Sequence, residues 1–227
     1  MRLLTACLIA IFSVTALAST SAQALPKATH AYGLNGTYID ELGGPPLVPQ
    51  GGFLGPQVYK FGAGQGLVLS NAVNPATYSI EFRLKIKTIT SQRNSYVKLL
   101  DWLDRSSDTG LYSQSGYAKF YNVIQATSPS IEANKYFDCT ITRNGSTKEV
   151  NVYVKGIFQF KFVDTNNLAM TAPGKNIIRF VQDDLTTSGG EAAAGEIDHI
   201  RIFKVVLTAK DASDLAKGLL PPNVRQK

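Results

Sequence analysis

Cysteine is scarce in this chain, which excludes a disulfide framework. The 227 residues include only Cys7 and Cys139, and Cys7 lies in an N-terminal segment that we expect to be removed. The remaining chain must therefore be held together by its apolar core, by a bound ion, or by both. Cys139 lies in the alternating segment 136–142, so we expect a small buried strand residue there rather than a reactive thiol.

Runs of one charge are also missing. Lys and Arg number 23 against 17 Asp and Glu, which gives a net charge of +6, but the basic residues are scattered. The aromatic residues alternate with apolar ones and do not interleave with a basic stripe, so the pattern does not favour nucleic-acid binding. The positive balance is consistent with a weak attraction to acidic polymers.

A long apolar run occurs only at the N-terminus. Arg2 precedes the run 3–18, and Ala22-Gln23-Ala24 supplies the small residues of a cleavage site. The run is shorter than the ~20 residues of a membrane-spanning helix. We predict a cleaved signal peptide over residues 1–24, with an uncleaved anchor as the alternative, and no membrane span afterwards. The protein is expected to be secreted or periplasmic, and the sequence leaves its oligomeric state open.

Short strands separated by turn signals fill most of the chain. Segment 78–87 alternates strictly between apolar and polar residues, which predicts a strand with one buried and one solvated face. Asn144-Gly145 between two alternating segments is a strong hairpin signal. Such spacing favours a β-sandwich or barrel. The predicted strands are 58–61, 67–69, 78–87, 97–103, 118–124, 136–142, 150–154, 157–162, 177–181 and 197–206.

One helix is expected near the C-terminus. Thr208 is a suitable N-cap, with Asp211 three residues later, and Gly218 can end the helix. Pro221 and Pro222 follow, so we predict a flexible tail over residues 219–227.

Several segments follow one another in a recognisable order. They include Leu-Asn-Gly-Thr-Tyr at 34–38, Tyr-Ser-Ile-Glu at 78–81, Phe-Val-Gln-Asp-Asp at 180–184 and Ile-Asp-His-Ile-Arg-Ile-Phe at 197–203. In this order the chain resembles the concanavalin A-like, laminin-G-like jelly rolls of secreted bacterial proteins. The resemblance implies an all-β, two-sheet antiparallel jelly-roll sandwich over residues 25–218. Lectins, adhesion modules, glycan hydrolases and enzyme appendages share this fold.

Extracellular jelly rolls of this kind often carry a structural calcium ion near a loop rim. Asp183, Asp184 and Glu191 place three carboxylates within nine residues, and these repel one another unless a cation neutralises them. Calcium prefers six to eight oxygen ligands. We therefore predict these residues as calcium ligands. The alternatives are a solvated acidic loop, or pairing with Arg179 or Arg201.

Sugar recognition requires an aromatic platform with polar groups beside it. Aromatic and polar residues cluster around segment 104–116, so we predict ligand binding by the rim loops 104–116 and 183–195. The alternative is that the aromatic side chains fill the sandwich core. The predicted ligand-binding residues are Trp102, Arg105, Asp108, Tyr112 and Tyr117.

Catalysis has little support in the sequence. Glycan hydrolases of this fold carry three acids along one strand, and here Glu196 and Asp198 are followed by Ile200 or Arg201 at the third position. By alternation, His199 should lie on the face opposite Asp198. We therefore predict no catalytic residues and a secreted binding module for carbohydrate or an extracellular polymer. The alternatives are a protein-interaction or adhesion module, and a glycan hydrolase or lyase.

Overall fold

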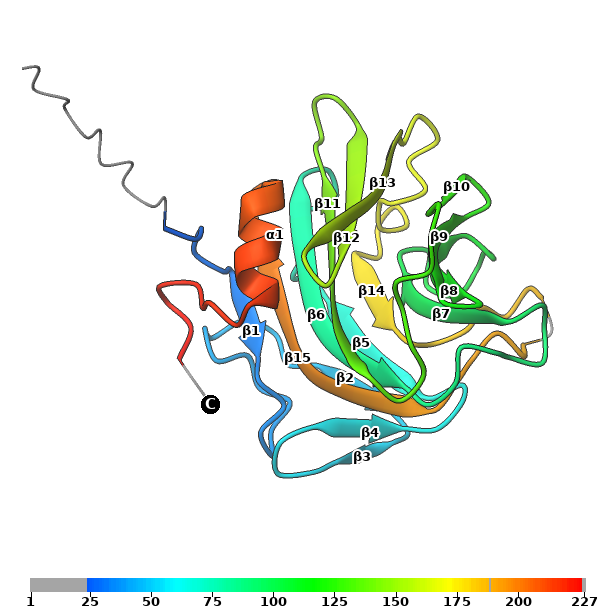
Figure 1. The fold of residues 1–227 in the computed structure, drawn as a ribbon. Helices are drawn as coiled ribbons and strands as arrows, with labels where there is room; N and C mark the ends of the chain where they lie inside the picture. Colours follow the sequence, from blue (N-terminus) through cyan, green and yellow to red (C-terminus); the bar gives the residue numbers. More distant parts are fainter. Residues whose placement is uncertain (1–23, 188, 226–227) are drawn as a thin grey trace, which may run out of the picture.

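The computed structural model describes residues 24–187 and 189–225. Two antiparallel sheets pack face to face, and one helix, α1 (Ala209–Ala216), lies against the outer side of the eight-stranded sheet (Figure 1). The predicted all-β sandwich with one short C-terminal helix is therefore confirmed.

The eight-stranded sheet, called sheet A, has β6 and β15 at its centre. Its order is β13 (Ile157–Val163), β12 (Glu149–Val154), β11 (Tyr136–Arg143), β6 (Tyr78–Ile86), β15 (Gly195–Phe203), β4 (Tyr59–Phe61) and β3 (Phe53–Leu54), with β1 (His30–Tyr32) also paired to β15. The seven-stranded sheet, sheet B, has the order β10 (Ile124–Gln125), β9 (Tyr117–Tyr121), β8 (Gly110–Gln114), β7 (Tyr96–Asp101), β14 (Ile177–Phe180), β5 (Gly66–Ser70) and β2 (Val48–Gln50).

The core fills the space between the sheets, as the alternation of β6 predicts. Ile80, Phe82 and Leu84 have no exposed surface. The opposite face of β6 is less solvated than predicted, because Ser79 and Glu81 are buried as well. The Ser79 hydroxyl donates to the Val205 carbonyl, so the chain after β15 covers that end of the strand.

The predicted hairpin and the predicted state of Cys139 are confirmed. Asn144 begins the loop between β11 and β12, and its side-chain oxygen accepts hydrogen bonds from the backbone N–H groups of Ser146 and Thr147. Cys139 is buried on β11, opposite Phe82 of β6. Burial raises the pKa of its thiol, so it behaves as an apolar side chain.

The C-terminal segment is anchored to the domain. Thr208 and Asp211 form a reciprocal capping box at the start of α1. Beyond the helix, the Asn223 amide accepts from Ala28 N–H and donates to Ala28 O, and Val224 packs on a small apolar cluster. Asn223 and Val224 therefore contact the domain, within the segment 219–227 that we predicted as a flexible tail. The predicted signal peptide lies, except for its last residue, outside the described residues.

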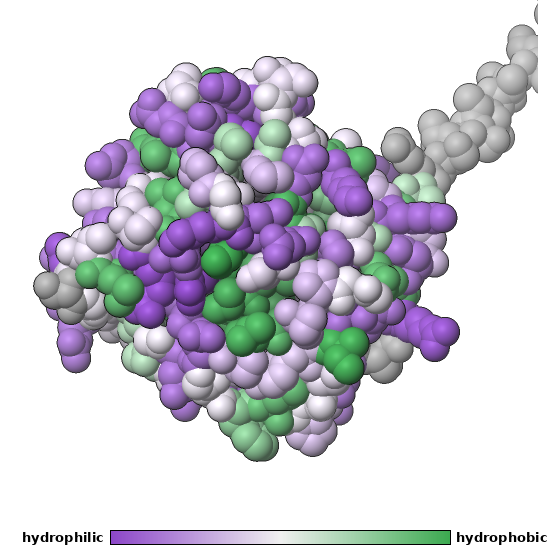
Figure 2. Space-filling model, turned by 180° about the vertical axis from the view of Figure 1, so that it is seen from behind, coloured by the Kyte–Doolittle hydropathy of each residue, from purple (hydrophilic) through white to green (hydrophobic). Residues whose placement is uncertain are grey.

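No helix in the described ranges is long and apolar enough to cross a membrane. Viewed from behind, the surface shows hydrophobic residues down its centre with hydrophilic residues on both sides (Figure 2). The most exposed large apolar side chains belong to loops, edge strands and hairpins; they include Phe53, Ile157, Phe158, Val163 and Leu185.

Candidate functional site

Two of the predicted ligand-binding residues lie inside the protein. Trp102 has no exposed surface and packs between Tyr78 and Phe120, with ring centroids 6.5 and 5.7 Å away. Tyr112 is also fully buried, and its hydroxyl donates to the carbonyl and carboxylate oxygens of Asp108. Neither ring can stack on a ligand, so both assignments are wrong. Segment 110–114, expected as part of a loop, forms β8, where the Tyr112 ring packs against Tyr96 and Tyr121.

The other three predicted residues remain partly accessible but do not form a platform. Arg105 donates from Nε to the Asp183 carbonyl, 2.6 Å away, which ties the two predicted rim loops together. Tyr117 is half-buried at the start of β9. Other tyrosines of this region contact one another: the ring centroids of Tyr96 and Tyr121 are 5.4 Å apart, with Lys119 above both rings.

Carboxylates do converge where the calcium site was predicted, but the set differs by one residue. Ligand oxygens of Asp108, Asp184 and Glu191 lie within 4.8 Å of one another. Asp183 is not in this group, because its two carboxylate oxygens accept the backbone N–H groups of Asp184 and Glu191 at 2.9 Å. Two of the three predicted ligands are thus brought together, and Asp108 takes the place of Asp183.

Nearby cations balance this cluster only in part. Lys98 is fully buried, with Nζ 3.6 Å from Asp184 and 3.5 Å from Asp101. Burial opposes ionisation of Asp184, but hydrogen bonds from Thr186 and the charge of Lys98 lower its pKa to about 2.

Glu191 is the poorly compensated member of the cluster. Burial and the charges of Asp108 and Asp183 raise its pKa to about 7, against the opposing charge of Arg93, whose Nε lies 3.4 Å away. Three carboxylates with an excess of negative charge and only oxygen donors suit a calcium ion.

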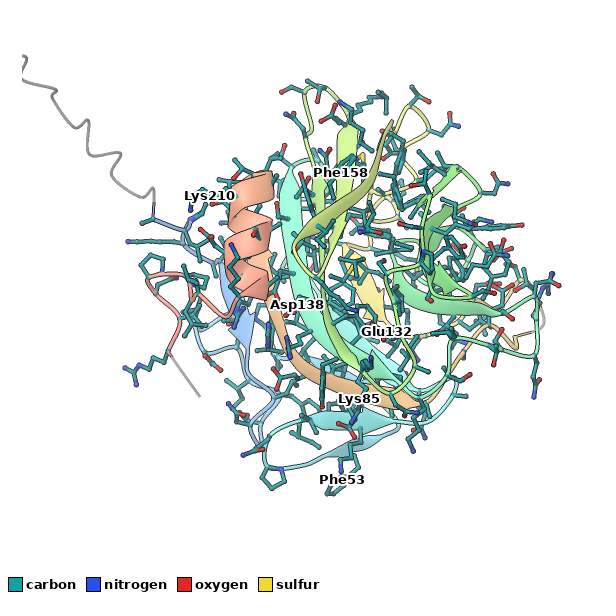
Figure 3. The ribbon with its side chains drawn as sticks, viewed as in Figure 1. Phe53, Lys85, Glu132, Asp138, Phe158 and Lys210 are labelled. Carbon is teal, nitrogen blue, oxygen red and sulfur yellow. The ribbon has the colours of Figure 1, made fainter. Side chains whose placement is uncertain are left out.

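A transverse row of side chains crosses the outer face of sheet A. Cross-strand pairing places Phe53 beside Lys60, Lys60 beside Glu196, Glu196 beside Lys85, and Lys85 beside Tyr136. These residues lie on the adjacent strands β3, β4, β15, β6 and β11, so the row spans about 19 Å at ~4.8 Å per strand. Figure 3 shows Phe53 at the edge of the molecule and Lys85 farther in, on the same side of the sheet. This set is called the outer row.

The centre of the outer row is fixed by its own contacts. The Tyr136 hydroxyl donates to Glu196, and Lys85 Nζ lies 3.0 Å from the same carboxylate. The hydrogen bond from Tyr136 and the charge of Lys85 lower the pKa of Glu196 despite partial burial. Lys85 Nζ also lies 4.9 Å from the centre of the Tyr136 ring. Glu196 is therefore an ionised acceptor held in one orientation.

An open cavity of about 500 Å³ adjoins the edge end of the outer row. Phe53 contributes an aromatic ring that is 66% exposed, and Lys60 and Lys87 contribute exposed ammonium groups. Gln65 and Glu196 add hydrogen-bonding groups to the lining. The cavity thus combines an apolar platform with convergent polar groups.

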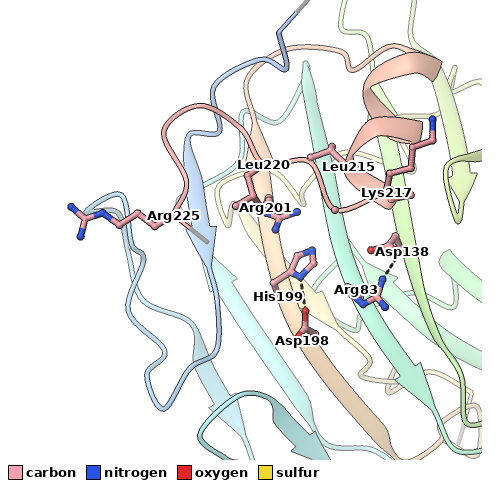
Figure 4. Close-up of a pocket in the computed structure, with 11 residues that line it drawn as sticks. Arg83, Asp138, Asp198, His199, Arg201, Leu215, Lys217, Leu220 and Arg225 are labelled. Carbon is pink, nitrogen blue, oxygen red and sulfur yellow. Dashed lines mark hydrogen bonds and ion pairs between the residues drawn. The ribbon is translucent and has the colours of Figure 1, made fainter. Parts of the chain in front are cut away.

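A second cavity, of about 420 Å³, opens beneath α1 on the same face of sheet A. Arg83, Asp138 and His199 lie side by side on β6, β11 and β15, and Leu215 of the helix forms part of the opposite wall (Figure 4). Arg83 donates to Asp138 at 2.8 Å. Arg201 lies one row farther along β15 and pairs with buried Glu81 at 3.1 Å.

A β-bulge shapes this second cavity. The register of β15 shifts between Ile197 and His199, so Asp198 is an extra residue. The prediction that Asp198 and His199 lie on opposite faces is therefore wrong: His199 Nδ1 is 2.7 Å from an Asp198 carboxylate oxygen, and Nε2 is 2.9 Å from Glu81. Burial disfavours the charged ring, but Glu81 and Asp198 raise the pKa of His199. Both ring nitrogens are occupied, so His199 offers no free base.

Glu81, Asp138 and His199 also bring ligand atoms within 4.8 Å of one another. Arg201 and Arg83 already pair with the two carboxylates, so these residues do not suit a metal ion.

The family of the chain follows from its sequence as well as its fold. Residues 61–213 match a laminin G family described as the concanavalin A-like lectin/glucanases superfamily, and the chain belongs to this family. The described architecture is the one that this membership requires. No curated protein resembles the chain in sequence.

Binding domains are among the solved structures with the same fold. Domain 4 of AbnA, a GH43 extracellular arabinanase from Geobacillus stearothermophilus solved with arabinotriose, has a TM-score of 0.60 and 17% identity, covering 85% of this chain and 99% of that domain. The binding domain of botulinum neurotoxin DC, solved with rat synaptotagmin II, has a TM-score of 0.63 and 17% identity. Botulinum neurotoxin type C is a toxin whose cell entry depends on interaction with two ganglioside molecules. Its structure has a TM-score of 0.62 and 17% identity. For both toxins the similarity covers 85% of this chain and 51% of the toxin chain.

Proposed function

We propose that this chain is a secreted or periplasmic carbohydrate-binding module that holds a glycan along the outer face of sheet A. The observation that carries the proposal is the outer row, which leads from the exposed Phe53 ring to the fixed Glu196 carboxylate between two open cavities. A sugar ring can stack on Phe53 while its hydroxyls donate to Glu196 and accept from Lys60 or Lys85. The arabinotriose and ganglioside ligands of proteins with this fold support the same class of ligand.

The module is proposed to bind without catalysis. The Glu196 carboxylate is engaged by Tyr136 and Lys85, and the Asp198 carboxylate is engaged by His199. A retaining hydrolase needs one protonated and one free carboxyl group across the sugar, whereas the pKa of Glu196 is lowered. No reducing ends should be released from a polysaccharide panel. Release that Glu196→Gln abolishes would instead establish a hydrolase.

Calcium is proposed to bind at Asp108, Asp184 and Glu191. There it would neutralise the excess carboxylate charge and join the loop after β7 to the loop after β14. Its role would be structural, since these residues are distinct from those of the outer row.

Binding to a panel of soluble polysaccharides, measured by calorimetry, tests the proposed function. Phe53→Ala should weaken binding at least tenfold, about 1.4 kcal/mol, and leave the melting temperature nearly unchanged because the ring is exposed. Phe158→Ala is the matched control: this ring is 49% exposed on β13, outside the outer row. Equal affinities of the two variants for every bound polysaccharide would refute binding at the outer row.

A protein partner is the second candidate. The edge strand β13 exposes Ile157, Phe158 and Val163, an arrangement that can accept another polypeptide. In that case the polysaccharide panel should give no binding, and Phe158→Ala should weaken capture of a specific protein from the culture medium or envelope.

A further inference from the structure

We propose that the glycan held on the outer face of sheet A is anionic and carries carboxylate or sulfate groups. This inference rests on the proposed function and adds the chemical class of the ligand. It is drawn from the positions of paired and unpaired charges around the two cavities.

The acidic groups of this face already have basic partners. Glu196 pairs with Lys85 at 3.0 Å, and Asp138 pairs with Arg83 at 2.8 Å. Beneath them, buried Glu81 binds both His199 and Arg201. These pairs leave little negative charge to repel an anionic ligand.

Several basic groups of the same face have no such partner. Among the described residues, the ammonium groups of Lys60 and Lys87 make no ion pair or hydrogen bond, although the charge of Lys60 contributes to the lowered pKa of Glu196, and both residues line the 500 Å³ cavity. Lys217 and Arg225 are likewise exposed without an ion pair at the rim of the 420 Å³ cavity, where Figure 4 shows their ends directed outward. These two cavities therefore have four exposed basic residues in their lining without an ion-paired acid: Lys60, Lys87, Lys217 and Arg225.

The two lysines of the 500 Å³ cavity are placed to hold acidic substituents. Lys60 lies on β4 and Lys87 directly after β6, on the two sides of β15. Lys60 is the direct neighbour of Phe53 in the outer row. A sugar ring stacked on Phe53 can therefore direct a carboxylate or sulfate group to Lys60, and the next unit can do the same toward Lys87.

The interspersed carboxylates favour a glycan over other anionic polymers. Glu196 lies between Lys60 and Lys85 in the outer row, and Asp138 lies beside Arg83. The closely spaced phosphates of a nucleic acid or an acidic membrane offer only hydrogen-bond acceptors, so they cannot bond to these carboxylates, which are acceptors themselves. A glycan offers hydroxyl groups, which donate to carboxylates, between its acidic groups.

Calorimetry with four polysaccharides provides the test: a polyuronate, a sulfated polysaccharide, and neutral chains of comparable linkage for each. The anionic chains should bind at least tenfold more tightly than the neutral ones in low salt. The difference should shrink as salt screens the lysines. The two anionic arms show whether carboxylate or sulfate is preferred.

Matched double variants separate a local effect from net charge. Lys60→Gln/Lys87→Gln should lower affinity for the preferred anionic chain at least tenfold and leave the melting temperature unchanged. Lys27→Gln/Lys204→Gln removes the same charge at exposed positions away from both cavities and should retain wild-type affinity.

Three outcomes would overturn the inference. Neutral chains that bind as tightly as anionic ones would leave a carbohydrate-binding module without an anionic preference. Equal losses in the two double variants would show a general charge effect. Duplex DNA or phosphatidylserine vesicles that bind as tightly as the anionic glycans, with the same dependence on Lys60 and Lys87, would assign the face to phosphate-rich partners. If the wild-type protein bound none of the polysaccharides, this result would instead refute the proposed function.

Discussion

Replacing Glu191 with glutamine tests whether this residue is an under-compensated buried carboxylate. In the unfolded chain it loses its proton near pH 4.5, whereas in the folded protein burial and neighbouring acids raise its pKa to about 7. Between these values the folded state binds more protons, so stability falls as pH rises. The shift corresponds to at most about 3.5 kcal/mol at ~1.4 kcal/mol per pKa unit.

Glu191→Gln removes the charge but retains the shape of the side chain. In chelator at pH 8 the variant should therefore be more stable than wild type, by about 1–3 kcal/mol. A domain of this size changes by ~2–4 °C per kcal/mol, so its melting temperature should rise by several degrees. At pH 4.5 wild-type Glu191 is already protonated in the folded state, and the difference should nearly disappear.

Calcium should reverse the order of stability. An ion bound as proposed would stabilise the folded wild type by mass action, while the variant lacks one ligand. Melting curves at pH 4.5 and 8, with calcium or with chelator, provide the measurement. Glu149→Gln is the control, because this carboxylate is barely buried and its pKa is lowered by Asn151 and Lys161. A Glu191→Gln protein less stable than wild type in chelator at pH 8 would refute the argument, and identical wild-type melts with and without calcium would refute the proposed ion.

Further predictions concern the core, the cavity and the helix. Arg143→Ala should cost about 3–5 kcal/mol in denaturant unfolding, because it leaves buried Asp164 without its 2.9 Å ion pair. Trp102→Ala should cost a similar 3–5 kcal/mol, and the folded fraction should keep its glycan affinity; a selective loss of binding would return Trp102 to the site. His199→Gln should be destabilised most at low pH. The raised pKa of His199 gives the folded wild type a stabilising charge, which is complete below pH ~6.5 and is lost as pH rises through the folded pKa. A destabilisation that is independent of pH would contradict this. Thr208→Ala should cost about 1 kcal/mol by removing the capping box, and an unchanged unfolding midpoint would argue against that cap.

Local patterns predicted much of the fold. Alternation located β6 and β11, and Asn144-Gly145 located the β11–β12 hairpin. The short strands β1, β2, β3, β8 and β10 were missed, because two to five residues give too little alternation to distinguish a strand from a loop. Because β8 was not predicted, Tyr112 was assigned to a loop and therefore to the ligand-binding site.

The site was predicted less well than the fold, because its residues meet only through sheet pairing. Alternation indicates that Lys85 and Arg83 share a face of β6, but it carries no information about the strands beside them. The outer row joins residues as far apart in sequence as Phe53 and Glu196. Likewise, Asp108 joins Asp184 and Glu191 through the meeting of two loops.

The sequence by itself determined the class of structure: alternating side chains make two β-layers, a Thr208–Asp211 box starts one helix, and Cys139 lies in a strand. Side-chain period and capping are properties of neighbouring residues, so they can be read locally. Only the tertiary structure decided which strands pair and in which register, where the bulge at Asp198 lies, and that Trp102 is part of the core. These outcomes depend on the register between distant strands, which minimises exposed apolar area over the whole domain rather than within any one segment.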